Sequence, residues 1–195
     1  MKISIARGEL LEALSVVSRG LSSRTTLPIL SGIHIATRGD QVIFQATDLE
    51  VSIRTSCKAK VDQPGESVLP GKLLTDVVRS LPEAAVTIDT STANAAAVVC
   101  GQSSFSLKTL SAEDYPRFPE VDAEQTVSLP SETFSHVVHQ VSRSVSRDET
   151  RPILTGILVV VEAGGLRMVA TDSYRLCVRE VELPGVSNEI ELVVP

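Results

Sequence analysis

Apolar residues recur at helical spacing in three segments of the chain. In the first segment, Leu10, Leu14, Val17 and Leu21 follow the i, i+4, i+7, i+11 pattern of one helix face, which predicts a helix over residues 8–21. The second stripe is Leu73, Leu74, Val77, Val78 and Leu81, and the third is Phe134, Val137, Val138, Val141 and Val145. Three short runs of strand character follow each of the first two stripes, so the pattern predicts an α+β fold of repeated strand–helix–three-strand units with antiparallel sheets.

These units are copies of one another. Residues 17–48 recur without a gap at 141–172, and 13 of 32 positions are identical. Pro28-Ile29-Leu30 returns as Pro152-Ile153-Leu154 at a constant offset of 124 residues. A repeat of this length indicates a duplicated domain. We therefore predict a complete domain at residues 1–112, a proline-punctuated linker at 113–125, and a second domain at 126–195 that stops before its second helix, with a third domain absent.

Composition narrows the class of protein. With 43% hydrophobic residues the chain can bury an ordinary core, and no apolar run approaches the roughly 18 residues of a membrane span. Because the start also lacks the features of a signal peptide, a cytoplasmic protein is expected. Cys57, Cys100 and Cys177 lie far apart and are odd in number, which favours free thiols over disulfides.

The sequence carries no familiar catalytic or metal-binding motif. His136 and His139 are three residues apart without a third ligand nearby, so no metal and no cofactor are predicted. Asp48 and Asp172 occupy equivalent repeat positions after Ala-Thr. They could form a catalytic pair, but an aspartate at a strand end more often accepts hydrogen bonds from its own backbone in an Asx-turn.

The polar faces of the helices carry cations although the whole chain has a net charge of −6. His136, Gln140, Arg143 and Arg147 lie opposite the third apolar stripe, and Lys72 and Arg79 are two turns apart on the second helix. Such segregation focuses positive potential on one surface, as sequence-independent contact with phosphates requires. Since aromatic residues are only 3% of the chain, a duplex backbone is a better expected partner than stacked single strands.

Three classes of function follow from the residues. The first is a protein that tethers others to DNA, which the shared cationic helix faces favour. The second is a repeat-built adaptor without nucleic acid, which an even distribution of charge would favour. The third is an enzyme that uses Asp48 or Asp172, which a concave pocket around either carboxylate would favour.

Several motifs in fixed order resemble the bacterial DNA polymerase III β subunit family of sliding clamps. They are Met1-Lys2-Ile3, the loop from Arg24 to Leu30, Ala46-Thr47-Asp48-Leu49-Glu50, the stretch from Phe105 to Leu110 leading to Asp114-Tyr115-Pro116, and the stretch from Ala170 to Leu176. The resemblance implies a DNA clamp fold, with tandem β-α-β-β-β units, sheets outside and helix pairs lining a concave basic face. It also implies a non-catalytic subunit that encircles duplex DNA and tethers the replicative polymerase for processive synthesis.

The resemblance also assigns residues and partners. The DNA-facing cations would be Arg24, Lys72, Arg79, Arg143 and Arg147. A pocket for short linear motifs from the DNA polymerase III core, the clamp loader, other polymerases and repair proteins would use Arg151, Leu154, Thr171, Ser173, Tyr174, Arg175 and Leu176. When the subunit is full length, a head-to-tail homodimer would form through Leu73, Val77, Phe105 and Leu107.

Overall fold

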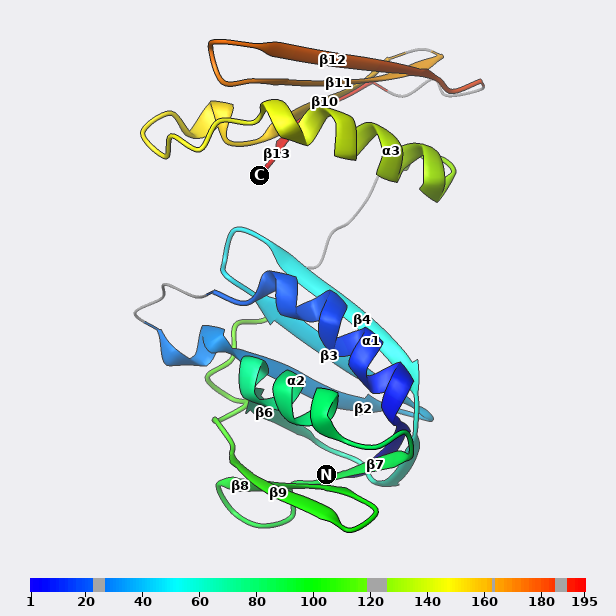
Figure 1. The fold of residues 1–195 in the computed structure, drawn as a ribbon, viewed down its shortest axis with the longest axis vertical. Helices are drawn as coiled ribbons and strands as arrows, with labels where there is room; N and C mark the ends of the chain where they lie inside the picture. The colour runs from blue at the N-terminus through cyan, green and yellow to red at the C-terminus, as the bar shows by residue number, and fades with distance from the viewer. Residues whose placement is uncertain (23–26, 119–125, 163, 185–188) are drawn as a thin grey trace. The chain divides into compact units, whose positions relative to one another are not determined.

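The computed structural model describes residues 1–22, 27–118, 126–162, 164–184 and 189–195 (Figure 1). The chain divides into two compact units, Met1–Glu120 and Val121–Pro195. Each unit is an antiparallel sheet structure covered by helices, which confirms the predicted α+β class. None of the helices in the described part of the chain is long and apolar enough to cross a membrane.

The first unit contains two antiparallel sheets and two α-helices. The helices are α1 (Arg7–Val17) and α2 (Gly71–Ser80). The five-stranded sheet has the order β5 (Lys60–Gln63), β1 (Lys2–Ala6), β7 (Ala85–Asp89), β8 (Ala95–Cys100) and β9 (Ser103–Lys108). The four-stranded sheet has the order β4 (Ser52–Lys58), β3 (Gln41–Thr47), β2 (Gly32–Arg38) and β6 (Glu66–Pro70). A short 3-10 helix, η2 (Pro28–Ser31), leads into β2.

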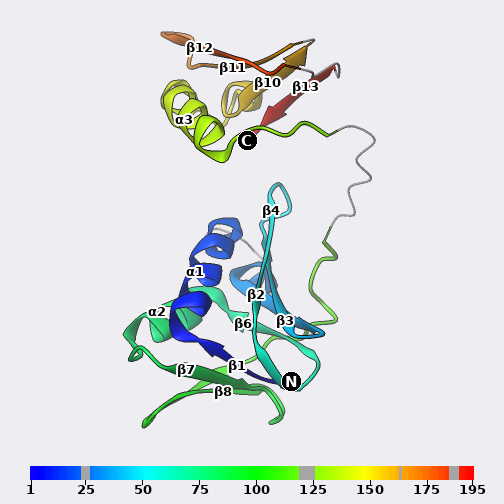
Figure 2. The ribbon, with the colours of Figure 1, turned by 90° about the vertical axis from the view of Figure 1, so that its right-hand side faces the viewer.

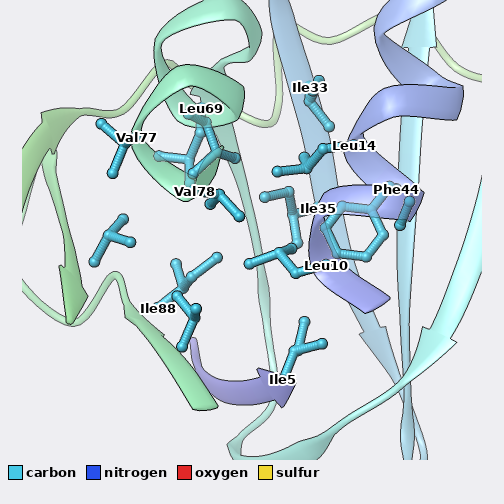
Figure 3. Packing of buried hydrophobic residues seen from close by; sticks show 14 of the residues in the cluster. Ile5, Leu10, Leu14, Ile33, Ile35, Phe44, Leu69, Val77, Val78 and Ile88 are labelled. Carbon is cyan, nitrogen blue, oxygen red and sulfur yellow. The ribbon is translucent and has the colours of Figure 1, made fainter. Parts of the chain in front are cut away.

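The two helices lie side by side and bury their apolar stripes against both sheets (Figures 1 and 2). Leu10 and Leu14 of α1 pack with Ile35 of β2, Phe44 of β3 and Ile88 of β7 in one core, as Figure 3 shows. All five side chains are fully buried. Burying one such side chain stabilises the fold by about 1.5–3 kcal/mol, so this cluster dominates the stability of the unit.

The first helix ends earlier than its apolar stripe predicts. It stops at Val17 and continues as a 3-10 turn, η1 (Ser18–Gly20), whereas the stripe predicted a helix to Leu21. Gly20 lies so close to β3 that a Cβ there would meet the carbonyl oxygen of Ala46 at 3.0 Å. Glycine is also a poor residue for a helix interior, so the chain turns away at this point.

The second unit has one α-helix on one antiparallel sheet. The helix is α3 (Ser131–Val141), followed by the 3-10 turns η3 (Ser142–Ser144) and η4 (Pro152–Leu154). The sheet has the order β12 (Leu176–Glu182), β11 (Gly165–Thr171), β10 (Ile157–Glu162) and β13 (Ile190–Val194). Val137 and Val141 of the helix pack on Leu166 and Met168 of β11.

Two expectations for the second unit are wrong. Residues 127–129 precede the third apolar stripe and would be the first strand of its strand–helix–three-strand unit, but they do not form a strand. Val127 and Leu129 still pack against the core. Phe134, assigned to the apolar stripe, is 46% exposed, so only the Val137 and Val141 part of the stripe is fully buried.

The segment after β9 packs against the first unit as a strap, which we define as residues 110–118. Leu110 donates its backbone N–H to the carbonyl of Val68, and the buried Tyr115 stacks on His34 of β2 with ring centroids 5.2 Å apart. The guanidinium of Arg54 lies 3.8 Å from the ring centroid of Phe118. His34 alternates with the buried Ile33 and Ile35, so the strap lies on the face of the sheet away from the helices (Figure 2). Part of the segment expected to be a linker is therefore held on the first unit.

Candidate nucleic-acid interface

Two of the predicted DNA-facing cations line one groove of the first unit. Lys72 and Arg79, on α2, border a groove of about 520 Å³ together with Asp76 and the apolar wall of Leu21. Both cationic side chains are exposed. Arg79 Nη1 lies 3.3 Å from the Asp76 carboxylate, an exposed ion pair whose contribution to stability is small. An anion of higher charge can therefore compete with Asp76 for this guanidinium.

Hydroxyl groups that the sequence did not single out complete the groove. Ser18, Ser22, Ser31 and Thr75 line it beside the two cations. Ser18 Oγ and Thr75 Oγ1 are 3.3 Å apart, and Thr75 donates to the carbonyl of Gly71. Ser31 Oγ donates to the carbonyl of Pro28 at 2.7 Å, so Lys72 and Arg79 are the groups of this groove that can contact phosphate oxygens of a nucleic-acid backbone. The only signal in the sequence was the high serine content around the end of the first helix.

The predicted cations of the second unit follow α3, with Arg143 in η3 and Arg147 in the irregular segment after it. Arg143 and Arg147 are both exposed. Arg143 Nη2 lies 2.7 Å from Nε2 of His139, one helical turn earlier. A groove along the first turns of α3 is lined by Ser131, Glu132, Ser135, His136 and His139. Arg24, the remaining predicted DNA contact, lies outside the described residues.

The residues predicted to form a peptide pocket are partly brought together. Arg151 Nη1 donates to Ser173 Oγ at 2.8 Å, which links the turn before η4 to the turn after β11. Arg151 Nε also contacts the Asp148 carboxylate at 2.8 Å. Hydrogen bonds from the Thr150 side chain and backbone, and then from Arg151, hold the pKa of Asp148 below its usual value. Leu154 is half-buried, whereas Leu176 and Tyr174 are 65% and 95% exposed.

Asp172 and its neighbours form a tight turn at the same place. Its Oδ1 accepts hydrogen bonds from the backbone N–H groups of Tyr174 and Arg175 at 3.0 Å and 2.9 Å, and Thr171 Oγ1 donates to the carbonyl of Arg175. These backbone bonds, with the Arg175 guanidinium 3.0 Å from Oδ2, lower the pKa of Asp172. Asp48 makes the equivalent bonds in the first unit, which confirms the Asx-turn interpretation over a catalytic pair.

The residues predicted for subunit contact divide into two pairs. Leu73 and Phe105 are 50% and 39% exposed, whereas Val77 and Leu107 are buried in the core of the first unit. Phe105 lies on β9, which is the edge strand of its sheet. A partner could contact Leu73, Phe105 and the edge of β9, whereas Val77 and Leu107 lie in the core beneath them.

Within the residues that the structure describes, no three His, Cys, Asp or Glu side chains are grouped so that they could hold a metal ion. Cys57, Cys100 and Cys177 are free thiols.

Both units of the chain match domains of known proteins. Residues 1–119 match the family model of the DNA polymerase III beta subunit N-terminal domain, and residues 128–195 match that of its central domain. A beta sliding clamp of Streptomyces coelicolor is 38% identical over 180 residues, which is 92% of this chain and 47% of the relative. A beta sliding clamp of Micrococcus luteus is 38% identical over 194 residues, which is 97% of this chain and 62% of the relative.

Solved structures give the same result. The DNA polymerase sliding clamp of Bacillus subtilis superimposes with a TM-score of 0.93 at 33% identity, covering 100% of this chain and 54% of that one. The DNA polymerase III beta subunit of Pseudomonas aeruginosa superimposes with a TM-score of 0.91 at 30% identity, covering 100% and 54%. The chain thus spans about half the length of the relatives that it matches. Its two units correspond to the N-terminal and central domains in chain order, and the chain therefore belongs to the DNA polymerase III beta subunit family.

Proposed function

We propose that this chain is part of a sliding clamp that encircles duplex DNA and tethers the replicative DNA polymerase to it, without catalysing a reaction itself. The observation that carries the proposal is the groove between η1 and α2, where Lys72 and Arg79 meet the hydroxyls of three serines in a chain of net charge −6. Family membership supports the same reading. In a ring, weak phosphate contacts are sufficient because the topology, rather than the affinity, retains the protein on DNA.

Arg143 and Arg147 supply the corresponding contacts in the second unit. Both residues are exposed and follow α3, Arg143 in η3 and Arg147 just after it, whereas Val137 and Val141 of α3 face the sheet. Arg24 joins the set on the basis of the family resemblance alone. These contacts do not depend on the DNA sequence, because such polar groups contact phosphates rather than base edges.

The partner contacts of the clamp are further parts of the proposal. Arg151, Leu154, Thr171, Ser173, Tyr174, Arg175 and Leu176 form one half of a docking site for short linear motifs of the polymerase III core, the clamp loader, other polymerases and repair proteins. The exposed Leu176 and the Arg151–Ser173 contact support it, since such motifs bind through a few apolar anchors beside polar rims. Leu73 and Phe105 belong to the contact that closes a head-to-tail homodimer, and the assembly acts in the cytoplasm.

The electrostatic part is tested by titrating a fluorescent DNA duplex with the 195-residue chain at several salt concentrations. Lys72→Ala, Arg79→Ala, Arg143→Ala and Arg147→Ala should each weaken binding and reduce the log–log salt slope by about 0.9 for each lost phosphate contact. Lys60→Ala and Arg167→Ala remove the same charge from the sheet strands β5 and β11 and serve as matched controls. Equal losses in both groups would refute a dedicated DNA surface.

The docking part needs a separate experiment. A peptide with apolar anchors, corresponding to a short linear motif of a replicative polymerase, is titrated against the chain while backbone amide NMR signals are followed. Binding should move the signals of residues 151–154 and 171–176 together, and Leu176→Ala should weaken it. Shifts confined to other parts of the chain would contradict this assignment.

A further inference from the structure

We propose that His139 and Arg143 form a proton-responsive part of the DNA contact, in which the neutral imidazole holds the guanidinium and protonation of the imidazole adds a second cation beside it. The inference rests on the proposed DNA contact of α3. It concerns how that contact responds to pH, which neither the cationic groove nor the family relationship addresses.

The hydrogen bond between the two side chains carries the inference. Arg143 Nη2 and His139 Nε2 are 2.7 Å apart. A guanidinium has only donors, so Nε2 must accept. An imidazole that accepts through Nε2 is neutral and carries its proton on Nδ1. The contact therefore exists in only one protonation state of His139, and the position of Arg143 is linked to that state.

The charged groups around His139 come from α3 and from η3, which follows it. The groove beside it is lined by Ser131, Glu132, Ser135, His136 and His139, so Glu132 and His136 are the titratable neighbours on one side and Arg143 is the charge on the other. The strands β11 and β12 pack on α3 through Val137 and Val141. The titratable group that they bring to the helix is Cys177, whose Sγ donates to the carbonyl of Gln140 at 3.8 Å. Arg167 on β11 is paired with Glu162 and Glu180.

Protonation reverses the interaction. An imidazolium has two donors and no acceptor, so it cannot keep the bond from Arg143, and two adjacent cations repel each other. A phosphate oxygen placed between them relieves this repulsion. DNA binding therefore favours the protonated state and takes up a proton, and histidine is the side chain whose charge changes between about pH 5 and pH 8. Binding should strengthen as the pH falls through this range.

The number of counterions that binding releases from DNA sets the size of the effect. One additional cation in contact with phosphate steepens the log–log salt slope by about 0.9. At roughly 0.1 M salt this corresponds to about a fivefold to tenfold gain in affinity between about pH 8 and pH 6.

The experiment titrates the 195-residue chain with a short DNA duplex at about pH 8 and pH 6 while the imidazole nitrogen signals of His139 are followed by NMR. The wild-type chain should bind more tightly at the lower pH, and DNA should shift the titration of His139 upwards. His139→Gln keeps an amide oxygen that can accept from Arg143 but cannot gain a charge, so this variant should lose the pH-dependent gain. His34→Gln, on β2 of the first unit and outside the proposed DNA surface, is the control and should retain it.

Two outcomes are decisive. If His139→Gln keeps the full gain, or if DNA leaves the His139 titration unchanged, the inference is overturned. Arg147→Ala and Lys72→Ala separate this failure from failure of the DNA contact itself. If they weaken binding at both pH values, the cationic surface stands whatever His139 does, whereas no effect from either would remove the contact on which the inference rests.

Discussion

Asp48 and Asp172, which lie 124 positions apart, accept the same two backbone hydrogen bonds. Oδ1 of Asp48 accepts from Glu50 at 3.0 Å and from Val51 at 2.7 Å, and Oδ1 of Asp172 accepts from Tyr174 and Arg175 at 3.0 Å and 2.9 Å. The residue after each aspartate has a positive φ, 79° at Leu49 and 75° at Ser173. Left-handed backbone is unfavourable for both residues, so the two carboxylates fix a strained turn that the duplication has preserved.

The Asp172 turn should make the second unit sensitive to acid. Hydrogen bonds from Arg175 and Tyr174 lower the pKa of Asp172, so its contribution to stability is present above the unfolded-state value near 4 and is lost as the pH falls through the lowered value. Asp172→Asn should reduce the stability of the second unit near neutral pH and flatten its decline below about pH 4. The stability of the second unit is measured by hydrogen exchange of the β11 and β12 amides at a series of pH values. Glu191→Gln, an exposed position on β13, is the control.

Gly32 and Gly156 occupy equivalent repeat positions, and both lie against a neighbouring strand. A Cβ on Gly32 would be 2.4 Å from Cγ1 of Val68, and one on Gly156 would be 2.6 Å from the carbonyl oxygen of Val194. Backbone cannot move away as a flexible side chain can. We therefore expect Gly156→Ala to disrupt the pairing of β10 with β13, and to destabilise the second unit by about 1–3 kcal/mol.

Gly8→Ala is the matched control for Gly156→Ala. Gly8 lies in α1, and its nearest neighbour is the far end of the Glu83 side chain at 3.2 Å. Alanine should therefore stabilise the helix by about 0.5–1 kcal/mol. Thermal unfolding of the two variants tests this, and a destabilised Gly8→Ala or a neutral Gly156→Ala would contradict the steric argument.

The sequence predicted those features that depend on local periodicity and on the duplication. The spacing of Leu10, Leu14 and Val17 identified the buried face of α1, and the repeat placed the Asp48 and Asp172 turns correctly. The position where α1 ends depends on how closely Gly20 approaches β3, which is a contact between segments distant in sequence. Periodicity carries no information about such contacts.

The candidate site also combines features that the sequence predicts with contacts that only the folded chain creates. The cations Lys72 and Arg79 were predicted because they share a helix face, but the serines beside them come from η1, the following turn and η2. The His139–Arg143 bond depends on rotamers that spacing alone does not determine. Likewise, Tyr115 was read as part of a linker because of the prolines around it, and only the folded sheet supplies His34 for it to stack on.

Cys57 should be an unreactive thiol at neutral pH. Burial, and then the negative charge of Glu9, raise the pKa of Cys57 from 9.0 to about 11. The thiolate is the nucleophile, so alkylation by iodoacetamide at pH 8 should be about a hundredfold slower than for a thiol of ordinary pKa, and should accelerate up to about pH 11. Mass spectrometry of the Cys57 peptide gives the rate, with the urea-unfolded chain as reference. A Cys57 rate that equals the unfolded rate would contradict this.

Ionisation of Tyr115 should weaken the packing of the strap on the first unit at alkaline pH. Burial raises the pKa of Tyr115 from 10.0 to about 12, so the folded first unit keeps the phenol neutral where the unfolded chain ionises it. Below about pH 10 both states hold the proton and stability does not depend on this group. Between about pH 10 and 12 the unfolded state holds fewer protons, so the free energy of unfolding should fall as the pH rises.

Tyr115→Phe isolates the contribution of this phenol from that of the other groups in the chain. The Tyr115 hydroxyl lies 3.3 Å from the carbonyl oxygen of Gln45, and losing this bond should cost about 0.5–1.5 kcal/mol near pH 8. The phenylalanine variant has no ionisable group there, so its deficit should shrink towards pH 11 and beyond as the wild type loses stability. Urea unfolding of both proteins, followed through the backbone amide signals of β2 and β3, measures the difference between their free energies of unfolding. A deficit that stays constant from pH 8 to pH 11 would show that Tyr115 ionises equally in both states, and that the strap does not shield it from water.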